Sequence, residues 1–277
     1  MVPPIPFDII DTPAGTAVRT SGGVFLRLTG SPIPLLTLQA LAGGHHIALD
    51  AAETVSWTRV QAEITDRHER EAAPVWPALK RRILVICTEP ALGYLASDLT
   101  ELGAEVCTVD TTTGHDRVDG DSTRQINQAL TAAEPALVLW LAQSLPPWQL
   151  WEHLDALAGR GVAWLRMHRE GCQLWVDPIS LDATDASSAQ VLQRRLAASG
   201  TAKELASWLR GPTNSPPALS SLASRMVGLR VLDMVQAWAF DAERLRSYRT
   251  HAWQFNTRSL QSSEHPVVAY PQPAPIQ

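Results

Sequence analysis

The apolar run Arg82–Cys87 constrains the fold of this chain more than any other segment, because it is continuous rather than alternating. Such a run is typical of a strand that is buried on both faces of a sheet. Glu105–Asp110, Pro135–Leu141 and Val162–Met167 predict further strands. Leucines at helical spacing lie between them, at positions Leu92, Leu95, Leu99 and Leu102 and at Leu150, Leu154 and Leu157. This alternation predicts right-handed crossovers and a mostly parallel sheet, and therefore an α/β domain.

We expect this domain to span residues 81–277, with a sheet core at 81–178 and a more helical part at 179–277. The helical part is predicted to contain helices at Ser188–Ser199 and Thr201–Arg210. A long helix follows, with an apolar stripe from Leu219 to Val235. The polar segment Thr111–Thr123 predicts a loop.

A smaller module is predicted at residues 1–73, followed by a linker at Glu71–Lys80. Its expected strands are Phe7–Thr12, Thr16–Thr20 and Val24–Leu28. One helix is expected to begin with Ser31 as N-cap and to end at Gly43-Gly44, and a second to span Trp57–Arg70. This order of elements predicts a winged-helix-like module.

Composition excludes several classes of protein. The 277 residues carry a net charge of −5, so nothing in the overall charge favours nucleic acid, and the segment Trp57–Arg70 mixes basic with acidic side chains. Met1–Pro6 has no basic region followed by an apolar run, and no stretch approaches the ~20 apolar residues of a membrane span. Three cysteines far apart fit free thiols. We expect a cytoplasmic protein.

The turn after Arg82–Cys87 is where a sheet of this kind binds a nucleotide, because glycines let the backbone approach a pyrophosphate. The adenylating pattern is Gly-x-Gly-x-x-Gly, but of its glycines only Gly93 is present here. Glu89 places a negative charge where phosphate would lie, and Pro90 removes an N–H donor. The sequence therefore predicts no ATP, NAD or other cofactor at this turn.

Other candidate groups have a plain alternative. His45-His46 is either a metal-binding pair or two exposed loop histidines, and Cys172 is either a nucleophile beside His168 or a partly buried thiol. We identify no catalytic set of serine, histidine and aspartate, because those residues are scattered along the sequence.

Two segments resemble the zinc-binding segments of ThiF-like partner proteins in ribosomal-peptide modification. In that family, a Gly-Pro-Leu segment precedes Cys-x-x-Cys-Leu-x-x-Arg, and the chain closes on His, then Pro-x-Cys-Pro-x-Cys. Here Val176–Leu181 corresponds to the first segment, and the cysteine positions hold Ser188, Val191, Pro273 and Ile276. None of these four residues supplies a thiolate, whereas structural zinc takes about four Cys or His ligands. We predict no metal.

The resemblance covers most of the chain. The chain resembles a ThiF-like, leader-peptide-binding partner of a YcaO-type cyclodehydratase, with degenerate zinc and nucleotide sites, of the kind used for azole-containing peptides such as thiopeptides. It implies that the first module binds the leader of a precursor peptide and that the YcaO partner forms azolines from Cys, Ser and Thr. This chain would then be non-catalytic, with a precursor peptide and the cyclodehydratase as partners, and with a homodimer as a possibility that family members show.

The resemblance also implies where the leader binds: beside the third strand as an added strand, packed against the last helix of the module. The residues at these positions are Val24, Phe25, Leu26, Arg27 and Leu28 on the strand and Arg59, Val60, Glu63, Ile64 and Arg67 on the helix. If the N–H of Leu26 faces outward, Leu26→Pro deletes a donor at this edge. Two other functions stay open: a divergent adenylating enzyme, and a winged-helix regulator with a ligand-sensing domain.

Overall fold

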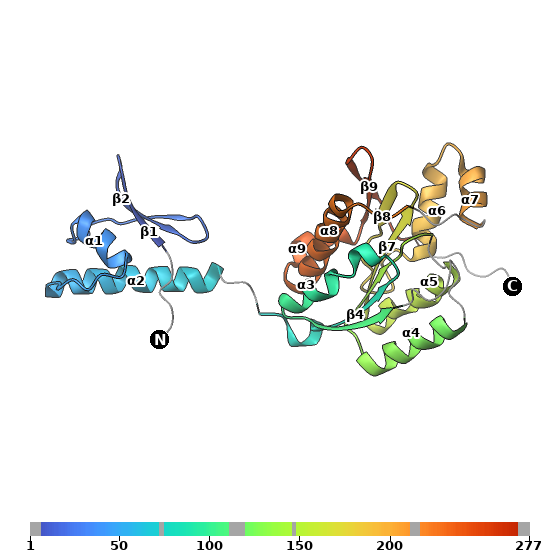
Figure 1. The fold of residues 1–277 in the computed structure, drawn as a ribbon, viewed down its shortest axis with the longest axis horizontal. Coiled ribbons are helices and arrows are strands. Elements are labelled where there is room, and N and C mark those ends of the chain that lie inside the picture. Colours follow the sequence, from blue (N-terminus) through green and yellow to red (C-terminus); the bar gives the residue numbers. More distant parts are fainter. Residues whose placement is uncertain (1–6, 72–74, 111–119, 146–147, 211–216, 271–277) are drawn as a thin grey trace. The chain divides into compact units, whose positions relative to one another are not determined.

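The chain divides into two compact units, Met1–Pro74 and Val75–Gln277 (Figure 1). The computed structural model describes residues 7–71, 75–110, 120–145, 148–210 and 217–270. Most of the loop predicted at 111–123, and the two zinc-ligand positions Pro273 and Ile276, lie outside these residues.

The first unit is a three-stranded antiparallel sheet with two helices. Its strands are β1 (Phe7–Thr12), β2 (Gly15–Thr20) and β3 (Phe25–Arg27), in spatial order β1-β2-β3. Its helices are α1 (Leu35–Ala42) and α2 (Ala51–Glu71). The core lies between the sheet and the helices and consists of Ile9, Val18, Ile33, Leu38, Val60 and Ile64. All three strands lie where the sequence predicted them.

Both helices of this unit begin at residues other than those predicted. The Ser31 hydroxyl accepts the N–H of Ile33 at 3.2 Å and forms a turn, and α1 begins only after Pro34. Helix α2 begins before Trp57, because Asp50 and Glu53 cap each other: each side chain accepts the other residue's backbone N–H, at 2.8 and 3.0 Å.

The second unit is built on a seven-stranded mixed sheet in the order β10-β9-β8-β7-β6-β4-β5. Four strands are parallel: β4 (Arg82–Cys87), β5 (Glu105–Asp110), β6 (Leu137–Leu141) and β7 (Ala163–Glu170). Three follow antiparallel: β8 (Gln173–Val176), β9 (His251–Asn256) and β10 (Ser262–Pro266). The α/β class predicted from the apolar runs is confirmed.

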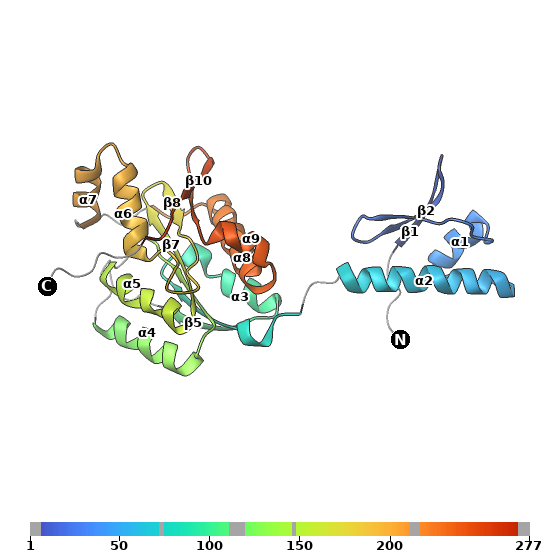
Figure 2. The ribbon, with the colours of Figure 1, turned by 180° about the vertical axis from the view of Figure 1, so that it is seen from behind.

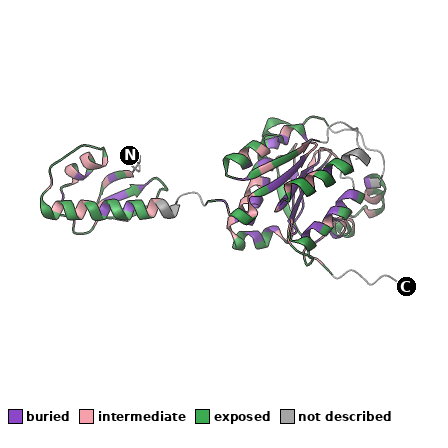
Figure 3. Ribbon diagram, turned by 90° about the horizontal axis from the view of Figure 1, so that it is seen from below, coloured by how far each residue is buried: buried purple, intermediate pink, exposed green. Residues whose placement is uncertain are grey.

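Helices cover both faces of this sheet (Figures 1 and 2). One face packs against α3 (Leu95–Glu101), α8 (Ser221–Phe240) and α9 (Ala242–Tyr248). The other packs against α4 (Gly120–Ala133), α5 (Trp148–Leu154) and the 3-10 helix η3 (Asp155–Arg160). Helices α6 (Ser188–Ala198) and α7 (Ala202–Arg210) lie toward the antiparallel end. Short 3-10 turns, η1 (Ala78–Lys80) and η2 (Pro90–Leu92), flank β4. Figure 3 shows the buried residues concentrated along the strands.

Three predictions for this unit were wrong. The predicted linker includes Trp76, which is buried in the core of the second unit and lies edge-on to Phe240 with ring centroids 5.2 Å apart. The part at 179–277 is not only helical, since β9 and β10 extend the sheet. Residues 120–123, the end of the predicted loop, instead begin α4, in which Ile126 is buried and Ala129 and Leu130 pack beside it.

No helix in the described parts of the chain is long and apolar enough to cross a membrane.

Candidate peptide-binding site

Among the described residues, strand β3 pairs with β2 alone, so β3 forms an open edge of the small sheet. Val18 pairs with Leu26, and the pairing is flanked by bonds of 2.9 Å from Thr20 N–H to Val24 O and from Leu28 N–H to Thr16 O. In an antiparallel ladder, bonded and non-bonded pairs alternate. The N–H and C=O of Leu26 therefore face β2, and those of Phe25 and Arg27 face outward.

This hydrogen-bonding pattern of β3 overturns one expectation. Leu26→Pro would remove a bond inside the sheet rather than a donor at its edge, so the informative position is Arg27. Strand β1, at the opposite edge of the sheet, gives independent support for this hydrogen-bonding pattern. The side chain of Gln39, on α1, donates to the carbonyl of Ile9 at 3.1 Å, so Ile9 O points away from β2. Val18, which pairs with Ile9, is thus free to bond β3.

The two faces of β3 differ in character. Leu26 and Leu28 pack against the core beside Val18, whereas Phe25 lies on the opposite face and is 59% exposed. Arg27 lies on the same outer face as Phe25 and is exposed. A strand added beside β3 would therefore meet an apolar face on the side of the core and an aromatic and basic face on the other side.

The residues predicted on α2 divide into two groups. Val60 and Ile64 are buried in the core of the unit, so they support the sheet rather than line an open groove. Arg59 and Glu63 are exposed, and Arg67 is half-buried. Helical spacing places Arg59 and Glu63 on the flank away from Trp57, whose ring lies 6.2 Å from that of Phe7 on β1.

In the second unit, the turn after β4 is closed by its own contacts. The N–H groups of Thr88 and Glu89 both donate to the carbonyl of Leu141, at 2.9 and 3.3 Å. Pro90 begins η2, and the Glu89 carboxylate accepts the N–H of Ala91 at 3.2 Å. The backbone donors that a phosphate would need are therefore engaged within the protein.

A buried charge also occupies this turn. Glu89 is 2% exposed, and its carboxylate lies 3.8 Å from the guanidinium of Arg169, which is itself buried. Burial raises the pKa of Glu89 more than the Ala91 N–H and the Arg169 charge lower it. The residues present thus do not fit a nucleotide phosphate. The expectation that no nucleotide binds here stays a prediction.

Ser188 and Val191, the two positions of the family's zinc cysteines that the structure describes, serve other purposes. Ser188 opens α6, and its hydroxyl donates to Asp155 at 2.7 Å. Val191 is buried in an apolar cluster with Ala252 and Val267. Neither side chain is a metal ligand. Within the described residues, no three His, Cys, Asp or Glu side chains gather closely enough to hold a metal ion.

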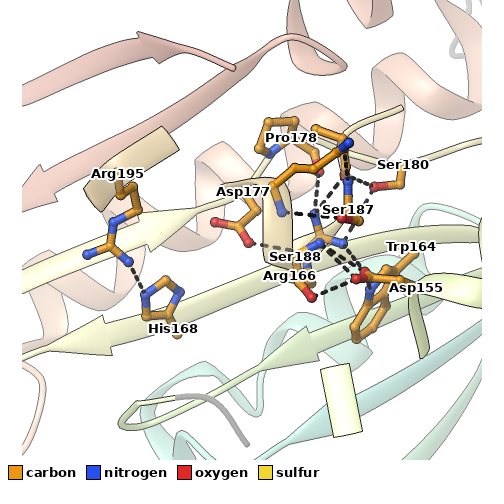
Figure 4. Close-up of polar contacts among 12 residues, drawn as sticks. Asp155, Trp164, Arg166, His168, Asp177, Pro178, Ser180, Ser187, Ser188 and Arg195 are labelled. Atoms are coloured by element: carbon orange, nitrogen blue, oxygen red, sulfur yellow. Dashed lines mark hydrogen bonds and ion pairs between the residues drawn. The ribbon is translucent and has the colours of Figure 1, made fainter. Parts of the chain in front are cut away.

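A buried arginine ties this region together (Figure 4). Arg166, on β7, is fully buried and contacts Asp177 at 3.1 Å and Asp155 at 3.0 Å. Its guanidinium also reaches the carbonyls of Pro178 and Ala186, at 3.4 and 3.5 Å. Because Asp155 also holds the start of α6, the network joins β7, η3, α6 and the segment after β8. Sequence reasoning missed it, because Arg166 lies inside an apolar run.

The remaining candidates do not form a catalytic set. His45 and His46 are exposed. His168 is buried, and its Nε2 lies 3.0 Å from Glu170 and 3.3 Å from Arg195. Cys172 is a half-buried free thiol.

Comparison with known proteins shows what this fold is similar to. No family model and no curated protein matches the sequence. Among solved structures, a chain of the E. coli microcin synthetase McbBCD complex with pro-MccB17 bound is 11% identical, with 96% of each chain covered and a TM-score of 0.52. The heterocyclase TruD is 15% identical, with a TM-score of 0.55. A heterocyclase in complex with substrate and cofactor is 13% identical, with a TM-score of 0.54.

These likenesses differ in extent. The chain spans nearly the full length of the microcin synthetase chain, but it covers 41% of TruD and 38% of the other heterocyclase. At these identities the comparison concerns the fold. The structure thus has the fold of a chain of the microcin synthetase complex and of part of these heterocyclases, which confirms the predicted resemblance at the level of the fold.

Proposed function

We propose that this protein binds the leader of a ribosomally made precursor peptide and delivers the peptide to a YcaO-type cyclodehydratase. The partner would form azolines from Cys, Ser or Thr with loss of water, using ATP. This chain supplies recognition, and the chemistry belongs to the partner.

The observation that carries the proposal is the open margin of β3. Phe25 and Arg27 direct N–H and C=O groups outward, as β-strand addition requires, while the side chains beside them offer one apolar and one aromatic and basic face. Main-chain bonds would supply affinity, and the two faces would supply selectivity. Val24 and Leu28 bound the strand, and Arg59, Glu63 and Arg67 form the rim on α2, over the supporting Val60 and Ile64.

The fold adds context to that edge. Its likeness to a chain of a synthetase complex and to heterocyclases supports a role in making heterocyclised peptides. A tethered leader raises the effective concentration of the modifiable residues at the partner, so that several residues are processed in one encounter.

The closed turn after β4 supports a non-catalytic role. A nucleotide at this turn would have to displace the bonds to Leu141 O and place phosphate beside the Glu89 carboxylate. An adenylating activity would therefore need another site.

The test uses the full chain and fluorescently labelled leader peptides taken from the genomic neighbourhood of its gene. We expect saturable binding by fluorescence polarisation, displaced by the unlabelled leader but not by a scrambled leader of the same composition. We also expect the chain to accelerate azoline formation by the partner, measured by mass spectrometry as the loss of water from the core peptide. Equal displacement by the scrambled leader would contradict the proposal.

A further inference from the structure

A separate pocket lies at the antiparallel end of the large sheet, under helices α6 and α7. Its cavity volume is about 280 Å³. The strands contribute Trp175, Ala252, His265, Pro266 and Val267, and the helices and their connection contribute Arg194, Arg195, Ala198, Ser199 and Leu205. Neither the closed turn after β4 nor the β3 edge shares a residue with it.

The floor of this α6–α7 pocket is rigid. The ring of Trp175 is stacked by the guanidinium of Arg195 at 4.2 Å and lies 5.5 Å from the ring of His265. Arg195 is in turn fixed by Glu170, at 2.5 Å. The Glu170 carboxylate thereby neutralises the charge of Arg195, and the role of Arg195 here is to hold the indole in place.

The two charged side chains that line the pocket, Arg194 and Arg195, are both basic. Arg194 is exposed, and it makes no hydrogen bond or ion pair with another described residue. The indole N–H of Trp175 is buried without an acceptor. Among the described residues, no Asp or Glu lines the cavity, while Leu205, Ala252 and Val267 provide apolar walls. A site with a free guanidinium and apolar walls suits a ligand that has a negative end and an apolar body.

We infer that the α6–α7 pocket binds an apolar carboxylate, with the carboxylate on Arg194 and the apolar group over Trp175. The volume is just below the range of drug-sized sites, which starts at roughly 300 Å³, so the occupant is small. It is either a free acid or the C-terminal residue of a peptide, since both present the same carboxylate beside an apolar group.

The probe is 3-phenylpropionate, titrated into the full chain by calorimetry and by ligand-observed NMR. We expect saturable binding with a Kd of about a millimolar or tighter. Arg194→Gln should weaken it at least about fivefold, because a charge-assisted bond is lost. Arg160→Gln, which changes an exposed arginine on η3 away from the cavity, should leave the affinity within about twofold. The neutral analogue 3-phenyl-1-propanol should bind at least about fivefold more weakly than the acid.

A second variant tests the cavity itself. Ala198 is exposed at the end of α6, so Ala198→Trp should fill the pocket without disturbing the core, and it should abolish binding. Equal weakening by Arg194→Gln and Arg160→Gln would overturn the inference, as would unchanged binding to Ala198→Trp or the absence of saturable binding to the unmodified chain.

A third arm separates the two sources of ligand. The peptide Gly-Gly-Gly-Phe is compared as free acid and as C-terminal amide. Binding of the acid but not the amide, competitive with 3-phenylpropionate, assigns the pocket to peptide ends. Failure of the peptide acid where 3-phenylpropionate binds assigns it to free acids. Equal binding of acid and amide would show that the carboxylate is not read and would overturn the assignment.

Discussion

Strands β3 and β10 are both free sheet margins, but they present different groups to solvent. On β3, Phe25 and Arg27 direct complete sets of donors and acceptors outward. On β10, the bond from Asn256 N–H to Gln261 O fixes which residues bond to β9. The backbone N–H and C=O groups of Ser262 and Glu264, and the C=O of Pro266, therefore face outward. Pro266 has no N–H to give, and every residue of β10 is exposed. Proline and polar side chains are how proteins discourage pairing at an edge.

The rest of each unit follows the same division. The sheet of the first unit rests on a core of six buried residues. The second unit has a larger core and a buried ion network that joins four elements around Arg166. Under the proposed function, recognition belongs to the unit whose sheet has an unpaired edge, and the scaffold role belongs to the unit whose elements the buried ion network joins. Four experiments test this contrast.

The largest effect is expected in the scaffold. Arg166→Ala leaves Asp155 and Asp177 buried without their counter-ion, so the second unit should lose about 3–5 kcal/mol of unfolding free energy. Chemical denaturation followed by tryptophan fluorescence measures this, because Trp57 is the only tryptophan of the first unit. Arg160→Ala is the control and should change stability by less than about 0.5 kcal/mol. A similar small loss for Arg166→Ala would show that the network does not tie the scaffold.

The next effect is a pH dependence at Glu170. Burial alone would raise the pKa of this carboxyl, but the His168 hydrogen bond and the charges of His168 and Arg195 lower it to about 2. A depressed folded-state pKa stabilises the fold above the unfolded value of about 4.3, and the stabilisation disappears as the pH falls toward 2. The resulting loss of unfolding free energy is at most about 3 kcal/mol.

Urea denaturation between pH 5 and pH 2 measures this loss, since the pH dependence should be shallower in Glu170→Gln than in the unmodified chain. Parallel pH profiles for the two proteins would show that Glu170 is not the group responsible.

Proline substitutions compare the two edges directly. Arg27→Pro removes an outward N–H from β3, and leader affinity should fall at least about tenfold. Ser262→Pro removes the equivalent N–H from β10 and should leave that affinity unchanged. Arg27→Ala separates the side chain from the donor and should weaken binding less than Arg27→Pro. Equal losses for Arg27→Pro and Ser262→Pro would remove the distinction between the two edges.

The smallest effect is expected with nucleotide. Because the donors at the turn after β4 are engaged, titration with ATP and Mg²⁺ should give no saturable heat. Glu89→Ser, which removes the buried carboxylate, is titrated with ATP and Mg²⁺ in the same way for comparison. Micromolar binding of ATP by the unmodified chain would favour the adenylating alternative.

The sequence was informative where one physical rule dominates. The continuous run Arg82–Cys87 predicted a doubly buried strand, and this strand is buried along most of its length. Strands β9 and β10 were missed, although Trp253 and Phe255 alternate along β9 and their rings stack at 5.5 Å. That signal is short and follows a long helix, so the helical pattern of the preceding residues concealed it.

The site residues illustrate a different limit. A sequence can place Leu26 and Arg27 on one strand, but the hydrogen-bonding phase depends on the register with Val18 and on the turn that sets it. Val60 and Ile64 have the spacing of a helix face, but only the fold shows that this face is the core itself. The partners that neutralise Arg166 lie on segments that no spacing rule connects.

Hydrogen exchange measured on the full chain, with and without the leader peptide, tests the central claim most directly. The outward amides of Phe25 and Arg27 exchange freely if their only potential partner is an added strand, whereas that of Leu26 is bonded to β2 in either state. We expect the leader to slow exchange at Phe25 and Arg27 and to leave β10 unchanged. Tight leader binding with no change at these two amides would contradict capture along β3.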